Sequence, residues 1–117
     1  MTFDEYTTQA RRTWNGAPDI IVAALGLTGE AGEFAEQVKK QIAQGHPFSK
    51  AKLSEEIGDV LWYCSLASDA IGISLDDIAQ SNISKLRARY PNGFDSKRSI
   101  DRKRIPYPEG DKFEITN

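Results

Sequence analysis

The chain has 117 residues, 39% of them apolar and 27% charged, which suits one globular domain with its own core. Its formal net charge of −2 leaves no basic excess for binding a nucleic-acid polymer, and its apolar runs are too short to span a membrane. Cys64, the only cysteine, excludes an intrachain disulfide, and the acidic segment after Met1 is unlike a secretory signal, so we expect a cytoplasmic protein.

The first two helices are predicted from their ends. Thr2 and Glu5 have the spacing of a capping box, and apolar residues then recur at helical intervals as far as Trp14. An Asn-Gly-Ala-Pro sequence ends this helix, and its proline suits the first turn of the next one. The second helix is predicted over residues 18–44, where a Gly-His-Pro sequence stops it.

Three glycines interrupt the pattern of the second helix. Gly26, Gly29 and Gly32 each weaken a helix by roughly 1 kcal/mol relative to alanine, and a kink or break near Gly26 is compatible with this. The glycines serve either close packing against another helix or space for a ligand beside neighbouring carboxylates. The sequence leaves both interpretations open.

Two further helices have clear boundaries. The third is predicted over residues 50–71, with Ser49 as its N-cap and Gly72 as its stop. The fourth begins after Ser74 and must end by Tyr90, because a proline follows.

Residues 95–117 differ from the rest of the chain in composition. Five of the eight residues from Lys97 to Arg104 are basic, and two prolines and an acidic end follow. We expect an irregular extension, which either is solvated or packs on a partner, or brings positive charge to an anionic ligand. The sequence as a whole predicts an all-α fold, with a four-helix bundle-like domain over residues 1–94 and an irregular tail.

Two pairs of carboxylates occupy matching positions in the second and third helices. Glu30 and Glu33 are three residues apart, as are Glu56 and Asp59, so each pair shares one helical face. Both pairs flank the apolar arc of their helix. If the two helices pack antiparallel through those arcs, the four carboxylates converge at a cleft beside the core.

Converging carboxylates favour a bound cation. They repel one another and raise each other's pKa, and a divalent ion relieves that repulsion. Mg²⁺ prefers oxygen ligands, bridges substrate phosphates and activates water, and we expect Mn²⁺ to substitute for it. The alternative is that both pairs are solvated surface residues. Glu36 and Glu55 point further from the apolar arcs, and a single histidine, His46, argues against di-iron or catalytic zinc sites.

The order of three sequence blocks resembles a known family. Residues 26–36 contain Glu-x-x-Glu, a spacer of 22 residues follows the second glutamate, residues 55–63 contain Glu-x-x-Asp, and a third block covers residues 82–91. Together they resemble the MazG-like nucleotide pyrophosphohydrolases of the all-α NTP pyrophosphatase superfamily. The resemblance covers roughly residues 3–94.

This resemblance implies roles for individual residues. The Mg²⁺ ligands, which include the catalytic carboxylates, would be Glu30, Glu33, Glu56 and Asp59. Asn82 and Lys85 fall on the family's Asn-x-x-Lys positions and would contact the nucleotide, with Lys85 on phosphate. Arg89 matches the end of the same segment, where packing and ligand contact are equally compatible. Tyr63 would contact the base or sugar, by similarity to the deoxycytidine-triphosphatase branch.

The reaction implied by the resemblance is hydrolysis of a nucleoside or deoxynucleoside triphosphate at the α–β linkage, which yields the monophosphate and pyrophosphate. A metal-dependent nucleotide sensor without turnover would have the same sequence features. A helical interaction module with solvated acidic pairs is a third interpretation. The phosphoribosyl-ATP pyrophosphohydrolase of histidine synthesis is a more distant alternative, because the third block is more MazG-like.

The two tryptophans and one helix face point to further contacts. Trp14 and Trp62 could each stack on a nucleobase, or else lie in the core and at a subunit interface, respectively. Trp62 and Leu66 lie away from the main apolar arc of their helix, which gives that helix a second face to bury. Since the similar proteins are dimers or tetramers, we expect a homodimer or homotetramer in which two chains complete one site.

Overall fold

The protein is built from helices. A computed structural model describes residues 1–102 and 115 of the chain. Five helices lie in this part: α1 Phe3–Arg11, α2 Ile20–Ala43, α3 Lys50–Ile71, α4 Leu75–Arg89 and α5 Ser96–Ile100. The described range contains no strand beyond an isolated bridge between Pro91 and Gly93, so the predicted all-α class is confirmed. None of the described helices combines the length and the hydrophobicity that a membrane crossing requires.

The helix boundaries follow the local capping chemistry of the sequence. The predicted capping box at the start of α1 is present, since Thr2 Oγ1 accepts from the Glu5 N–H at 3.0 Å and Glu5 accepts from the Thr2 N–H at 2.7 Å. Helix α2 begins two residues after Pro18, because Asp19 is its N-cap and accepts from the N–H groups of Ile21 and Val22.

The bounds of α3 and the end of α4 agree with the prediction. Ser49 caps α3 by accepting from the Lys52 N–H, and Gly72 ends the helix in the left-handed conformation with a φ of 72°. Ser74 caps α4 by accepting from the Asp77 N–H, and Tyr90 is its C-cap. The third and fourth helices are thus set by short-range signals.

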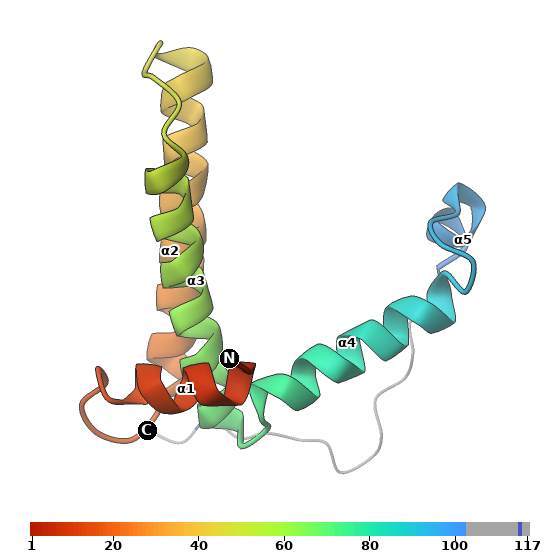
Figure 1. Cartoon of the computed structure of the whole chain (residues 1–117), viewed down its shortest axis with the longest axis horizontal. Helices are drawn as coiled ribbons and strands as arrows, with labels where there is room; N and C mark the ends of the chain where they lie inside the picture. Colours follow the sequence, from red (N-terminus) through yellow and green to blue (C-terminus); the bar gives the residue numbers. More distant parts are fainter. Residues whose placement is uncertain (103–114, 116–117) are drawn as a thin grey trace.

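The four main helices pack together at one end of an antiparallel pair, which two of them form. Helices α2 and α3 run side by side, α1 crosses their lower end, and α4 leads away from the same end (Figure 1). The buried residues gather where α1 meets the other helices: Thr7, Ala10, Ala23, Ser65, Leu66, Ser68 and Leu75. The Cα radius of gyration is 17.4 Å, against about 13 Å for a compact chain of this length. The single chain is therefore an open structure.

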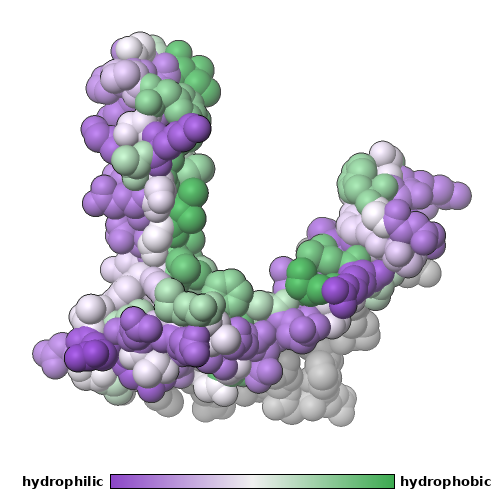
Figure 2. All heavy atoms as spheres, in the orientation of Figure 1, coloured by the Kyte–Doolittle hydropathy of each residue, from purple (hydrophilic) through white to green (hydrophobic). Residues whose placement is uncertain are grey.

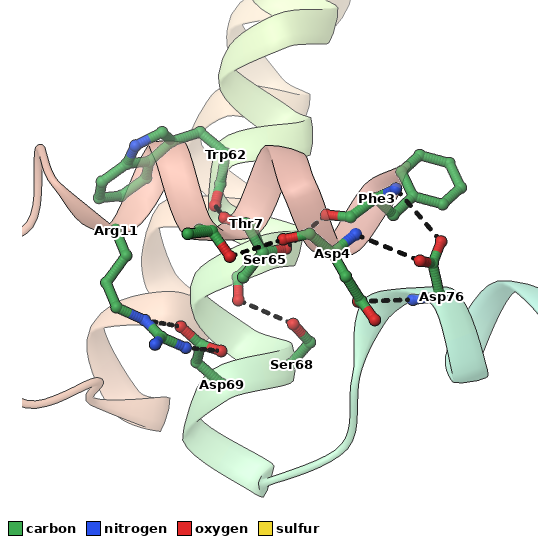
Figure 3. Close-up of polar contacts among 10 residues, drawn as sticks. Phe3, Asp4, Thr7, Arg11, Trp62, Ser65, Ser68, Asp69 and Asp76 are labelled. Carbon is green, nitrogen blue, oxygen red and sulfur yellow. Dashed lines mark hydrogen bonds and ion pairs between the residues drawn. The ribbon is translucent and has the colours of Figure 1, made fainter. Parts of the chain in front are cut away.

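Polar contacts attach α1 to α3 and α4 (Figure 3). The Asp76 carboxylate accepts from the N–H groups of Phe3 and Asp4, at 3.2 and 3.4 Å, and the Asp4 carboxylate accepts from the Asp76 N–H at 3.1 Å. Each aspartate thereby satisfies free donors at the start of the other's helix. At the other end of α1, Arg11 Nε donates to Asp69 of α3 at 2.8 Å. These contacts fix the angle at which α1 crosses the pair.

Much apolar surface remains uncovered in the single chain. Leu25 and Ile42 of α2 are 71% and 80% exposed, and Ile57 of α3 is 56% exposed. Figure 2 shows apolar side chains along the edge of the α2–α3 pair that faces α4. Apolar side chains that gather on one exposed edge are typical of an interaction surface.

Gly26 allows α2 and α3 to approach each other. A Cβ atom at Gly26 would collide with the ring of Tyr63 on α3, whereas a Cβ at Gly29 or Gly32 would meet no atom within 4 Å. Helix α2 continues through all three glycines, so no break occurs at Gly26. Close packing, one of the two predicted interpretations, is therefore the role of Gly26.

Replacing Gly26 by Ala should destabilise the fold, while Gly32→Ala should not. The added methyl group at Gly26 displaces the Tyr63 ring, and overpacking of this kind costs about 1–3 kcal/mol. At Gly32 the methyl group enters open space, and the better helix propensity should stabilise by up to about 1 kcal/mol. Urea unfolding of both variants measures the difference, and equal free energies of unfolding would contradict the packing role.

The segment from residue 95 is more regular at its start than predicted. Residues Ser96–Ile100 form α5, because Asp95 accepts from the Arg98 N–H at 3.1 Å and caps a single helical turn. A five-residue helix was not visible in the sequence, since helical periodicity needs a longer window. The predicted character of residues 103–114, 116 and 117 lies outside the described residues.

Candidate metal centre

Three carboxylates meet on one side of the α2–α3 pair. Glu30 comes from α2, and Glu56 and Asp59 come from adjacent turns of α3; one ligand oxygen from each lies within 4.8 Å of the others. The three-residue spacing of Glu56 and Asp59 places both on the face that meets α2. The predicted convergence of carboxylates from two helices is thus present for three of the four residues.

Glu33 lies outside this group of three. It is exposed, one helical turn after Glu30 on α2. It remains close enough for its charge to contribute to the raised pKa of Glu30. Being exposed, its side chain is free to turn toward the group.

The electrostatics of the group favour a cation. The pKa of the Glu30 carboxyl is raised, first by desolvation and then by the charges of Asp59, Glu56 and Glu33. The folded protein therefore holds negative charges together at a cost that a positive ion would offset. The repulsion would be relieved by any divalent cation. The choice of metal therefore depends on the chemical type of the donor atoms.

The donor set fits a hard metal ion such as Mg²⁺. All the donors are carboxylate oxygens. Mg²⁺ binds oxygen at about 2.1 Å, so two opposite ligands of one ion lie about 4.2 Å apart. The donor oxygens lie within 4.8 Å of one another, so only a small side-chain adjustment would bring them to this separation. The residues present therefore fit Mg²⁺ or Mn²⁺.

Two polar residues support the carboxylates. Gln37 Nε2 of α2 donates to Glu56 Oε1 at 3.4 Å across the helix pair. Tyr6 of α1 lies near Asp59, and its phenol has a pKa raised by burial, by Asp59 and by Cys64. Sequence reasoning missed Tyr6, which belongs to the apolar pattern of its helix and carries no motif. The sequence signal for Gln37 is its position two helical turns after Glu30, which puts both residues on the same side of the helix.

The predicted aromatic contacts lie where α1 crosses α3. The rings of Trp14 and Trp62 are 5.7 Å apart, and Trp62 meets the ring of Tyr63 edge-on at 4.9 Å. Both indole N–H groups have partners, since Trp62 donates to Thr13 Oγ1 at 2.8 Å and Trp14 donates to the Ala17 carbonyl at 3.1 Å. Both tryptophans are partly buried. The three rings form one aromatic cluster within the protomer.

The predicted nucleotide contacts of α4 border two different hollows. Asn82 and Lys85 line a groove of about 620 Å³ between α1, α3 and α4, whose floor includes Leu61 and Cys64. Lys85 and Arg89 also line a cleft between α4 and α5. The Arg89 guanidinium lies 5.9 Å from the centre of the Tyr90 ring. Lys85 is common to both hollows.

Comparison with known proteins gives a match over most of the helical region. Residues 22–94 match the MazG nucleotide pyrophosphohydrolase domain, a range that includes all four carboxylates and the Asn82–Lys85 segment. The chain is also similar to the Gene 37 protein of Mycobacterium phage L5, with 34% identity over 73 residues, which cover 59% of this chain and 64% of that protein. The chain thus spans just under two thirds of this curated relative. No solved structure matches it significantly.

Proposed function

Because the chain belongs to the MazG nucleotide pyrophosphohydrolase family, we propose that it is a Mg²⁺-dependent hydrolase of nucleoside or deoxynucleoside triphosphates. Cleavage at the α–β phosphate bond would yield the monophosphate and pyrophosphate. The observation that carries this proposal is the meeting of Glu30, Glu56 and Asp59 across the α2–α3 pair. We assign the activity to residues 1–94 and propose that Mn²⁺ substitutes for Mg²⁺.

The proposed roles of the carboxylates follow from their positions. Glu30, Glu56 and Asp59 would hold the metal, and Glu33 would complete the donor set by turning toward them. When bound, Mg²⁺ supplies charge neutralisation of the phosphates and acidification of a water molecule. Gln37 orients Glu56, and Tyr6 interacts electrostatically with Asp59. One of the carboxylates accepts the proton of the attacking water.

The proposed substrate contacts come from α3 and α4. Lys85 would bind phosphate, with Asn82 beside it in the groove and Arg89 one turn further along α4. The aromatic cluster of Trp14, Trp62 and Tyr63 offers a stacking surface for the base, worth about 1–3 kcal/mol per base contact.

We also propose that the working form is a homodimer or homotetramer. Leu25 and Ile42 of α2 are exposed in one chain, apolar side chains line the edge of the α2–α3 pair that faces α4, and α4 leads away from that pair (Figures 1 and 2). A second copy would cover the apolar edge and could bring its α4 to the first copy's metal centre. Sedimentation equilibrium should give a multiple of the chain mass, and a monomer at micromolar concentration would contradict this assignment.

Product analysis tests the proposed reaction. The purified chain is incubated with each of the common NTPs and dNTPs, with and without Mg²⁺, and the products are separated by ion exchange. We expect monophosphate and pyrophosphate in equal amounts, only when metal is present. Diphosphate and phosphate would place the cleaved bond elsewhere, and nucleotide binding without any product would identify a sensor instead of an enzyme.

A further inference from the structure

We propose that the cleft between α4 and α5 binds a polyphosphate chain, such as the phosphate tail of a nucleotide. The cleft has a volume of about 520 Å³ and is lined by charged side chains from the last turns of α4, from α5 and from the residues that follow α5. Its cationic residues are Lys85, Arg89, Lys97, Arg98 and Arg102. Three of them lie beyond residue 94, where the family match ends.

A short turn connects the end of α4 to α5. The chain turns after Tyr90 through Gly93, whose φ of 88° favours glycine. The rings of Tyr90 and Phe94 lie 5.6 Å apart across this turn. Asp95 then caps α5, and Lys97 and Arg98 of this helix line the cleft. The turn and the N-cap therefore place the basic residues around one cleft, in addition to their being close together in the sequence.

Among the described residues that line this cleft, the positive charges outnumber the negative ones. Five cations line it against two carboxylates, Asp95 and Asp101, which leaves an excess of three positive charges. None of the five cations forms an ion pair with an acidic group in the part of the chain that the structure describes. Like charges held close together repel, and an anion with several charges removes that repulsion. Arginine forks suit the oxygens of phosphate groups.

The dimensions and surroundings of the cleft favour a small ligand over a nucleic-acid polymer. Its volume is within the range of small-molecule sites, and the cations face one hollow instead of following an extended stripe. The chain as a whole has a net charge of −2, which opposes a long polyanion. In the single chain, α4 carries this cleft away from the α2–α3 pair (Figure 1). This inference rests on the proposed function in one respect, since that function makes a nucleotide the source of the phosphates.

Metal-free binding of inorganic triphosphate tests this site separately from catalysis. The full chain is titrated in EDTA by isothermal calorimetry, since without metal the carboxylates repel the anion. We expect 1:1 binding per chain, weakened at least about tenfold by the double substitution Lys97→Ala and Arg98→Ala. ATP should bind with the same sensitivity to these substitutions, and adenosine should not bind.

Matched controls make the outcome decisive. Lys50→Ala with Lys52→Ala removes the same charge from the start of α3 and should leave the affinity within about twofold of the wild type. Asp59→Asn should also leave metal-free binding intact. Absence of triphosphate binding, or an equal loss in both double variants, would overturn the proposal. A single-stranded oligonucleotide that displaces triphosphate at lower concentration would reassign the cleft to a polymer. If the protein bound triphosphate but hydrolysed no nucleotide, the proposed function would be wrong and this inference would stand.

Discussion

Replacing Asp59 by Asn should reduce Mg²⁺-dependent hydrolysis of the best nucleotide substrate by at least about a hundredfold. Asp59 belongs to the group of three carboxylates, and a neutral amide at this position loses both the charge and the preference for a hard cation. Even residues that only support a metal ligand change affinity or activity by about 10–100-fold, so a direct ligand should cost more. Steady-state rates at saturating Mg²⁺ and substrate measure the effect.

Glu55→Gln is the matched control for Asp59→Asn. Glu55 is an exposed carboxylate on the same helix, one residue before Glu56, and it is not part of the group of three. Its substitution removes one negative charge from α3 without removing a ligand, so it should keep the wild-type rate within about twofold. Circular dichroism should show the same helix content for both variants. A wild-type rate in Asp59→Asn would remove this residue from the metal centre.

Saturating Mg²⁺ should raise the melting temperature of the protein by roughly 10 °C. A ligand at a hundred times its dissociation constant stabilises the folded state by about 2.7 kcal/mol, and each kcal/mol shifts the midpoint by about 4 °C in a chain of this size. The ion acts on the folded state because Glu30, Glu56 and Asp59 come from two helices that meet only there. Differential scanning fluorimetry with and without Mg²⁺ measures the shift.

The pH dependence of this shift follows from Glu30. The pKa of Glu30 is higher in the folded than in the unfolded state, so protonation of Glu30 stabilises the fold. This stabilisation is complete below the unfolded pKa. It disappears as the pH rises through the folded pKa. The metal-free wild type should therefore lose stability relative to Glu30→Gln as the pH rises above about 4. The Mg²⁺ shift should grow over the same range, since ligands bind deprotonated. An equal Mg²⁺ shift in Glu30→Gln would contradict its role as a ligand.

The sequence alone predicted the four main helices and the positions of the carboxylates along them. Thr2, Ser49, Gly72 and Ser74 set helix ends through short-range backbone contacts, so the predicted boundaries agree with the structure at these positions. The spacing of Glu56 and Asp59 is likewise a local property, because residues three apart share a helix face. Such features need no knowledge of which helices pack together.

The tertiary structure decided which of these residues meet. The approach of α2 and α3 at Gly26 and Tyr63 brings Glu30 to Glu56 and Asp59 but leaves Glu33 outside this group, a difference that depends on the rotation of each helix about its axis. Tyr6 interacts electrostatically with Asp59 only because α1 crosses the pair, held by contacts to residues more than fifty positions away in the chain. Periodicity describes one helix at a time, so it cannot specify contacts between helices that depend on packing and capping across the whole chain.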